Sequence, residues 1–460
     1  MPPGIRQSLS VRRGVHSPFY PRFTTIALPS WSGNAKMTAA MRAASLDAIP
    51  VVTVFLYRRG KVLLLRRSDR VSTYRGRWAG VAGYLERHPV EQARLELKEE
   101  VGVSGEDVAL QGIGSPLLVR DPSVEKPWLV FTFLFRLKDG VRLTTDWETA
   151  AAEWVPPAEV ARRDTVPGLA DGLARVWPPW GQACFWREME QVATDTTTGA
   201  TDLAIRGLRL VSRLRGVSRR RGLSAYAAFH PSMGIFPHLA ARALGGTMSL
   251  RALARELDRA TAASAGAAAE LLQQCRRVLT HSASRACREA LLRWWQPGRE
   301  VVVTESRPKS EGVSLARDLA RAGLRVTLTS DAAVGVFVPR CDAVLVGADA
   351  IGGDDQLINK AGTRLIGLAA KESGIPCYAV AQTHKICPED WPLALAPQEP
   401  RDLATVRQAR VSNIAFDATP LSWFAEVVTE RGPLTAALLA AVRRRLGSWE
   451  RRLPANPWRR

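Results

Sequence analysis

The 460-residue sequence predicts an α+β domain followed by a helical part and a doubly wound parallel α/β domain of the Rossmann type. Three observations favour this organisation. Strand-like apolar runs surround one acidic helix in residues 51–155, and residues 191–275 are rich in Ala and Leu. From residue 276 onward, short apolar runs alternate with amphipathic segments of about ten to fifteen residues. That alternation is typical of a parallel sheet covered by helices.

The chain is longer than one ordinary hydrophobic core, and its 46% hydrophobic and 23% charged residues are typical of a soluble globular protein. No apolar run reaches the roughly 18 residues that a membrane-spanning helix needs, so we expect no membrane partner.

The expected order along the chain is an extension or transit peptide over 1–47, the first domain over 48–165, a linker over 166–190, the second domain over 191–447 and a basic tail over 448–460. Within the second domain, we expect a helical part over 191–275 and a Rossmann-like part over 276–447.

The first 46 residues are basic, rich in Ser and Thr, and free of acidic residues up to Asp47. This composition is typical of a mitochondrial or plastid transit peptide. Two alternatives stay open: a disordered extension, or a translation start at Met37 or Met41. No apolar segment follows the charges, which argues against a secretory signal. We expect an intracellular protein, plastid or mitochondrial if the extension is a transit peptide and cytoplasmic otherwise.

The formal net charge is +20, from 64 Lys and Arg against 44 Asp and Glu. Such an excess favours acidic partners, but the arginines are dispersed outside 213–221 and 443–460, and no nucleic-acid-binding motif is visible. Phosphorylated small molecules are therefore the expected partners, and nucleic acid is not supported. The six cysteines form no Cys-x-x-Cys pair, so we expect reduced core residues rather than a zinc site or disulfides.

The first domain opens with two strands that we expect to form a hairpin, since the apolar runs 51–57 and 61–67 flank a turn that ends at Gly60. Later strands are expected over 128–137 and 152–155. Strands around a single helix place this domain in the α+β class.

An acidic segment between these strands predicts a metal-binding helix. Glu96, Glu99 and Glu100 are spaced three and four residues apart, so they share one helix face. Like charges there destabilise a helix unless a cation binds, and carboxylate oxygens suit Mg²⁺ or Mn²⁺. The alternative is a solvated acidic face. We favour the metal site because a Gly-rich turn lies directly upstream. Gly102, which follows Val101, is expected to end the helix in a left-handed conformation.

Residues 78–103 resemble the Nudix box, the metal-binding loop and helix of Nudix hydrolases, which cleave diphosphates that join a nucleoside to another group. The resemblance covers about residues 51–160. It implies Mg²⁺- or Mn²⁺-dependent hydrolysis of a nucleoside diphosphate derivative, with Glu96, Glu99 and Glu100 as metal-binding and catalytic residues and Gly83 and Glu86 in the substrate-binding turn. Two departures stand against this. The spacing from Gly83 to Glu96 is two residues shorter than in the usual box, and Leu95 occupies the position of the family's Arg.

Five strands are expected in the second domain, over 277–280, 301–304, 325–329, 343–346 and 377–381. Their carboxyl ends run into polar residues at 280–285, 305–308, 330–331, 347–350 and 382–385. Because ligands of open α/β sheets bind beyond the carboxyl ends of the strands, we expect one pocket there. Ser284, Arg285 and Arg307 are therefore substrate-binding candidates. Ser282 and Ser284 have a structural alternative as helix N-caps.

The motifs at 280–282, 305–312, 347–351 and 359–363 resemble the alpha, beta and delta subunits of translation initiation factor 2B, a family that includes methylthioribose-1-phosphate and ribose-1,5-bisphosphate isomerases. The resemblance spans about 194–445. It implies proton-handling positions at Ser282 and Asp349, and pocket positions at Glu311, Asn359 and Lys360. It also implies a sugar phosphate or nucleotide as ligand, and homo-oligomers through this domain.

The isomerases of that family use a Cys and an Asp as their proton-handling pair. Asp349 matches the Asp, but Ser282 occupies the Cys position. A thiol has a pKa near ~8.5, whereas an alcohol does not exchange protons near neutrality unless a base activates it. His230 and Glu311 also replace the family's second substrate Arg and pocket Gln. We therefore favour a binding domain. Sugar-phosphate isomerisation and a non-enzymatic, initiation-factor-like regulatory role stay as alternatives.

Overall fold

The computed structural model describes residues 46–195, 198–246, 249–453 and 458. The extension or transit peptide expected over 1–47 thus lies almost entirely outside the described residues. The basic tail expected from residue 448 begins as packed structure, because Trp449 is fully buried and its ring lies 4.9 Å from that of Trp391.

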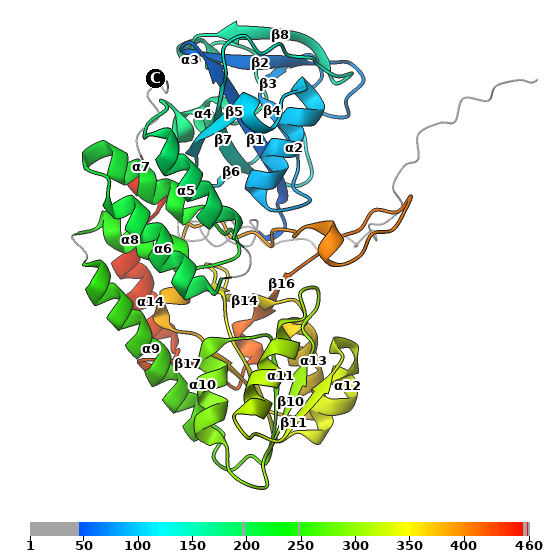
Figure 1. The fold of residues 1–460 in the computed structure, drawn as a ribbon, viewed down its shortest axis with the longest axis vertical. Coiled ribbons are helices and arrows are strands. Elements are labelled where there is room, and N and C mark those ends of the chain that lie inside the picture. Colours follow the sequence, from blue (N-terminus) through cyan, green and yellow to red (C-terminus); the bar gives the residue numbers. More distant parts are fainter. Residues whose placement is uncertain (1–45, 196–197, 247–248, 454–457, 459–460) are drawn as a thin grey trace, which may run out of the picture.

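The first domain is built on a mixed sheet of eight strands (Figure 1). They are β1 (Ile49–Arg58), β2 (Lys61–Arg67), β3 (Trp78–Ala79), β4 (Val81–Tyr84), β5 (Val108–Ile113), β6 (Leu117–Val119), β7 (Trp128–Leu137) and β8 (Thr149–Val155). β1 pairs with β2 as the expected antiparallel hairpin and with β7 in parallel. β4 pairs with β1, so the Gly-rich turn upstream of the acidic helix is held at the centre of the sheet.

The acidic helix is α2 (Pro89–Val101). Ala93, Leu97 and Val101, spaced four apart, are fully buried on its inner face. Gly102 ends the helix with φ 70°, and its N–H donates to the carbonyl of Leu97, which confirms the expected left-handed cap. The packing of the apolar face fixes the rotation of the helix and therefore the direction of its glutamates.

The segment expected as a linker, 166–190, is largely helical. It contains α4 (Leu169–Val176), after the short α3 (Pro157–Val160), and most of α5 (Ala183–Thr194). Leu169, Leu173 and Val176 are buried in one apolar cluster with Phe55 and Leu64 of the first sheet. The chain up to residue 176 therefore packs with the first domain, and only a short Pro- and Trp-rich piece connects α4 to α5.

Helices α5 to α9 connect the two sheets (Figure 1). After α5 come α6 (Ala200–Ser212), α7 (Gly216–Ala227), α8 (Ile235–Leu244) and α9 (Leu250–Leu271). α6 to α9 lie within 191–275, the segment expected to be helical, whereas most of α5 falls in the expected linker. The first half of α7 is the Arg-rich stretch, and only its second half is buried, around Leu223 and Tyr226.

The second sheet has the order β11-β10-β9-β12-β15-β17-β18, with its first six strands parallel. Its strands are β9 (Arg277–His281), β10 (Glu300–Thr304), β11 (Val326–Thr329), β12 (Ala343–Val346), β15 (Cys377–Val380), β17 (Glu426–Thr429) and β18 (Gly432–Pro433). The helices of this domain are α10 (Arg285–Trp294), α11 (Glu311–Arg321), α12 (Val334–Phe337), α13 (Thr363–Ser373) and α14 (Ala436–Leu446). The doubly wound order, in which the chain winds outward from β9 in both directions, confirms the expected class.

A small antiparallel sheet, β13-β14-β16, was not predicted. It consists of β13 (Ala350–Ile351), β14 (Gln356–Lys360) and β16 (Phe416–Pro420). It holds Lys360, the last residue of β14, beside the carboxyl edge of the parallel strands.

The first domain contacts the rest of the chain at several places, among them α2 and the residues just before it, and Arg175 of α4, which pairs with Glu450 at 2.9 Å. Arg94 of α2 forms a two-pronged ion pair with Glu190 of α5, at 2.6 and 2.9 Å. Arg87 pairs with Glu399 at 3.3 Å. Glu399 belongs to the segment between β15 and β16, coloured orange in Figure 1, which also carries Asp402 and Arg410.

All six cysteines are free. Four are buried, as expected, but Cys184 is exposed and Cys275 is half-buried, so the expectation of core positions is wrong for these two.

Within the described residues, no helix is both long and apolar enough to cross a membrane.

Candidate functional site

Three of the four glutamates of α2, namely Glu96, Glu99 and Glu100, line a cavity of about 700 Å³ in the first domain. Gly83 and Glu86, the two other residues predicted for this site, line the same cavity. A Cβ at Gly83 would overlap the carboxyl group of Glu96 in its present position. The Gly-rich strand β4 thus lets this carboxylate lie directly against its backbone.

Two of the glutamates are held by hydrogen bonds. Gln92 Nε2 donates to Glu96 Oε1 at 2.7 Å, and the backbone N–H of Ala82 donates to Glu100 Oε1 at 2.9 Å. Glu96 and Glu100 are each only 9% exposed, whereas Glu99 is exposed. Helix packing and these donors therefore fix two carboxylates and leave the third free to turn toward a ligand.

Burial raises the pKa of Glu100 well above its usual range, and the nearby carboxylates of Glu96, Glu148 and Asp146 raise it further. Burial also raises the pKa of Glu96. Such mutual repulsion is relieved by a divalent cation, and carboxylate oxygens are suitable ligands for Mg²⁺. Within the described residues, however, no three acidic, His or Cys side chains stand in a ready-made metal-binding group. The donor set fits the ion, but its side chains would have to turn to bind it.

Other residues of this cavity were missed by sequence reasoning. Asp146 and Glu148, just before β8, add two carboxylates, and they flank Trp147, which is 52% exposed. The remaining lining includes aromatic rings and arginines, namely Tyr74, Tyr84, Trp128, Arg67, Arg70 and Arg87. The Asp-Trp-Glu triplet was visible in the sequence, but only the structure shows that it lines this cavity.

Leu95 also lines the cavity, but the neighbouring Arg94 does not. The guanidinium of Arg94 lies over the ring of Phe135 and pairs with Glu190. The departure from the Nudix box at Leu95 is therefore not compensated by Arg94, whose charge serves the contact with α5.

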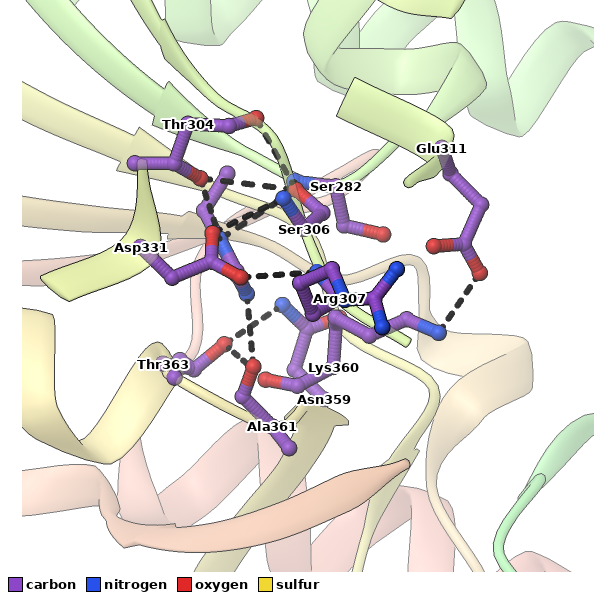
Figure 2. A network of polar contacts seen from close by, with 12 residues as sticks. Ser282, Thr304, Ser306, Arg307, Glu311, Asp331, Asn359, Lys360, Ala361 and Thr363 are labelled. Carbon is purple, nitrogen blue, oxygen red and sulfur yellow. Dashed lines mark hydrogen bonds and ion pairs between the residues drawn. The ribbon is translucent and has the colours of Figure 1, made fainter. Parts of the chain in front are cut away.

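A second cavity, of about 250 Å³, lies at the carboxyl edge of the second sheet. It brings together Ser282, Glu311, Asp349 and Lys360 from four separate segments of the chain. Glu311 begins α11 and accepts a 2.6 Å hydrogen bond from Lys360 Nζ (Figure 2). The expected convergence of strand ends into one pocket is thus present for these four residues.

Behind this cavity, a network of polar side chains fixes the loops that follow β9 and β10 (Figure 2). Asp331 accepts hydrogen bonds from the backbone N–H groups of Ser306 and Arg307, at 2.8 and 2.7 Å. The hydroxyl of Ser306 accepts from the N–H of Ser282 at 2.8 Å, and Ser282 has a φ of 66°. The loop is therefore anchored through its backbone, which leaves the Ser282 side chain at the cavity.

Four predicted substrate-binding residues lie outside the lining of this cavity. Ser284 caps α10, because its hydroxyl accepts a hydrogen bond from the backbone N–H of Cys287. This is the N-cap role that the sequence offered as its structural alternative. Arg285 forms ion pairs with Asp258 and Glu289, at 2.9 and 3.0 Å. The remaining two are engaged elsewhere: Arg307 donates to the carbonyl of Leu403, and Asn359 donates to the hydroxyl of Thr363.

The charges in the second cavity are mixed. Burial raises the pKa of the Asp349 carboxyl, and Lys385 and Lys360 oppose that shift. Burial lowers the pKa of His230 to about 3, so its imidazole is neutral near pH 7. The lining holds no thiol, and Ser282 has no imidazole bonded to it, because His281 faces Thr304 and the carbonyl of Ala361 instead.

Sequence reasoning also missed His88, Asp195, Thr198 and Lys309 in the second cavity. His88 is the unexpected one, because it belongs to the first domain and immediately precedes α2. No sequence signal links this histidine to a pocket almost 200 residues further along the chain. Only the packing of the domains brings it there.

Two family models match the chain. The NUDIX domain model matches residues 48–176, and the model of the initiation factor 2 subunit family matches residues 247–436. The first match ends where α4 ends, which agrees with the packing of α4 into the first domain.

Among curated proteins, the ribose 1,5-bisphosphate isomerase of Archaeoglobus fulgidus is 38% identical over 166 residues, which are 34% of this chain and 53% of that protein. A translation initiation factor eIF-2B subunit 2-like protein of Pyrococcus horikoshii is 34% identical over 180 residues, 39% of this chain and 64% of that protein. The chain thus spans between about half and just under two thirds of the length of these relatives.

Among solved structures, the translation initiation factor eIF-2B of Pyrococcus horikoshii OT3 matches 56% of this chain and 98% of its own length, at 26% identity and a TM-score of 0.49. The two family matches follow one another along the sequence without overlap. The chain therefore joins a NUDIX domain to a domain of the initiation factor 2 subunit family.

Proposed function

We propose that the first domain hydrolyses a nucleoside diphosphate derivative with Mg²⁺ or Mn²⁺. The observation that carries this proposal is the composition of the 700 Å³ cavity, in which carboxylates, arginines and aromatic rings face one space. The carboxylates suit a metal ion, the arginines suit phosphate oxygens, and the rings suit a nucleobase. The size of the cavity is within the range of small-molecule sites.

In this proposal, Glu96, Glu99 and Glu100 hold the metal. When bound, the ion would neutralise charge on the diphosphate and lower the pKa of a bound water. Arg67 and Arg70 orient phosphate oxygens. The reaction adds one water across a P–O bond of the diphosphate and leaves two phosphorylated products. A carboxylate of the same cavity accepts the proton of the attacking water, and Glu148 and Glu86 are the candidates from outside α2.

A panel of nucleotide sugars, ADP-ribose and dinucleoside polyphosphates, each incubated with the protein and Mg²⁺, tests this function. We expect at least one compound to yield a nucleoside monophosphate in a metal-dependent reaction. The absence of turnover across the panel would favour the alternative of a non-enzymatic regulator.

We propose that the second domain binds a sugar phosphate or a nucleotide without converting it. The 250 Å³ cavity presents Lys309 and Lys360 for an anionic group and Asp349 and Glu311 for hydroxyls. The similarity to ribose 1,5-bisphosphate isomerases supports a sugar phosphate as ligand. The hydroxyl of Ser282, without an adjacent base, favours binding over isomerisation.

Calorimetric titration with ribose 1,5-bisphosphate tests the binding role, and NMR of the same mixture tests for a ketose product. Binding without a ketose is expected. We also propose that the chain forms homo-oligomers through this domain, which sedimentation velocity checks directly.

A further inference from the structure

The two cavities are joined by a single turn of chain. His88 lines the second cavity, and Gln92, one helical turn later, lines the first. The carbonyl of His88 accepts from the N–H of Gln92 at 2.9 Å. The side chain of Gln92 then donates to Glu96, one of the glutamates proposed to hold the metal. The backbone of His88 is therefore linked to the carboxylate of Glu96 through two hydrogen bonds, both made by Gln92.

The imidazole of His88 has an unused hydrogen-bonding position. Its Nε2 lies 3.1 Å from the carbonyl oxygen of Phe229, so Nε2 must carry the proton and donate. Nδ1 is then an acceptor. It is buried and has no hydrogen-bond partner among the residues that the structure describes. Unpaired buried acceptors are uncommon. Because His88 is among the residues that line the second cavity, a small movement of the lining would bring Nδ1 to a donor of a ligand bound there.

His88 and His230 together form an uncharged part of the cavity wall. Their ring centroids lie 5.7 Å apart in an edge-on arrangement. Burial lowers the pKa of His88 to about 4, and that of His230 to about 3, so both rings are neutral near pH 7. Neutral imidazoles suit hydroxyl groups, while Lys309 and Lys360 elsewhere in the wall suit phosphate. The wall as a whole therefore fits a ligand that carries hydroxyl groups and a phosphate group.

We propose that His88 couples the two cavities: its ring binds a hydroxyl of a phosphorylated ligand in the second cavity, and this fixes the first turn of α2 and strengthens metal binding by the glutamates of the same helix. The inference rests on the binding role proposed for the second domain. It makes the first domain a part of the second binding site and links the occupancy of the two sites. By linkage, the metal then strengthens binding of the phosphorylated ligand by the same factor.

The contact between the domains offers a matched control. Glu190 pairs with Arg94 of α2 but lies in neither cavity. The substitution Glu190→Gln loosens the attachment of α2 to α5 without touching His88 or Gln92. His88→Phe keeps an aromatic ring beside His230 and removes both ring nitrogens. A difference between these two variants separates the role of the imidazole from a general loosening of the interface.

The test measures Mn²⁺ affinity of the full chain by electron paramagnetic resonance, with and without saturating ribose 1,5-bisphosphate. In the unsubstituted protein the bisphosphate should tighten Mn²⁺ binding about fivefold, within the usual range of coupling between sites. The same should hold for Glu190→Gln, whereas His88→Phe should show no tightening and bind the bisphosphate roughly fivefold more weakly. The bisphosphate itself complexes free Mn²⁺ to the same extent in every sample that contains it. This amount is measured without protein and subtracted from the bound Mn²⁺.

Two results would overturn the inference. If the unsubstituted protein binds the bisphosphate but its Mn²⁺ affinity stays the same or falls, coupling is absent while the binding role stands. This arm needs no variant, so it decides the matter even if His88→Phe does not fold. If the unsubstituted protein does not bind the bisphosphate, the proposed role of the second domain fails, and the coupling fails with it.

Discussion

Gly83 on β4 and Glu96 on α2 are packed so closely that a Cβ at residue 83 would overlap the Glu96 carboxyl group and force it to move. The carboxyl group of Glu96 occupies the volume in which a Cβ would lie. The absence of a side chain at residue 83 therefore lets the Glu96 carboxylate lie against the sheet. The same contact sets the depth at which Glu96 enters the cavity.

The substitution Gly83→Ala is expected to displace the Glu96 carboxylate and lower metal-dependent hydrolysis by roughly tenfold or more, because small displacements of catalytic groups are costly. Steady-state kinetics at varied Mg²⁺ measures this effect. Gly335→Ala is the control, since a Cβ there meets no atom within 4 Å. Equal activity of Gly83→Ala and the unsubstituted protein would show that the position of Glu96 does not matter.

At the second cavity, we expect ribose 1,5-bisphosphate to bind and to remain unconverted, because no thiol lines the cavity beside Asp349. Asp349→Asn should alter the affinity, because the carboxylate loses its charge, but it should leave the sugar unchanged. NMR detection of a ketose follows the reaction. A ketose formed by the unsubstituted protein and abolished by Asp349→Asn would establish an isomerase instead.

Glu256 of α9 should stabilise the fold in a pH-dependent manner. Arg242 donates two hydrogen bonds to its carboxylate, at 2.6 and 3.0 Å, and with the additional bond from His384 it lowers the pKa of Glu256 to about 2. A folded-state pKa below the unfolded value of about 4.3 gives stability that is fully present above pH 5 and lost as the pH falls toward 2.

The free energy of unfolding, measured from pH 7 to pH 2 for the unsubstituted protein and Glu256→Gln, tests this expectation. The difference between the two should shrink as the pH falls. Glu106→Gln serves as the control, because the side chain of Glu106 is 97% exposed and pairs only at 3.7 Å with Lys138. A difference that is constant over this pH range would refute a role for the ionised carboxylate.

The sequence was sufficient for elements whose pattern is local. β7 (Trp128–Leu137) and β12 (Ala343–Val346) agree with the expected strands residue for residue, because β12 is a continuous apolar run and β7 is interrupted only by Thr132 and Arg136. α2 was likewise predictable, since its buried face and its carboxylates follow the helical repeat. Site residues that belong to such elements, including Glu96 and Glu100, could therefore be found without a structure.

Features that depend on distant contacts could not be predicted. β14 pairs with β16, and the partners Lys360 and Phe416 are far apart along the chain, so no local pattern signals the pairing. α7 lies in the segment expected to be helical, but no local pattern shows that Tyr226 in its second half is buried against α6 and α8. His88 enters the second cavity for the same reason. Its neighbours in sequence belong to another domain.

The central claim, that the glutamates of α2 carry a metal-dependent hydrolysis, is tested most directly by the double substitution Glu99→Gln and Glu100→Gln. The amides keep the size of the side chains and remove the two charges that would hold the ion. Hydrolysis of the best compound of the nucleotide panel should fall by at least about a hundredfold, with unchanged binding of ribose 1,5-bisphosphate at the second cavity. Turnover that survives in the double variant at the rate of the unsubstituted protein would contradict the claim.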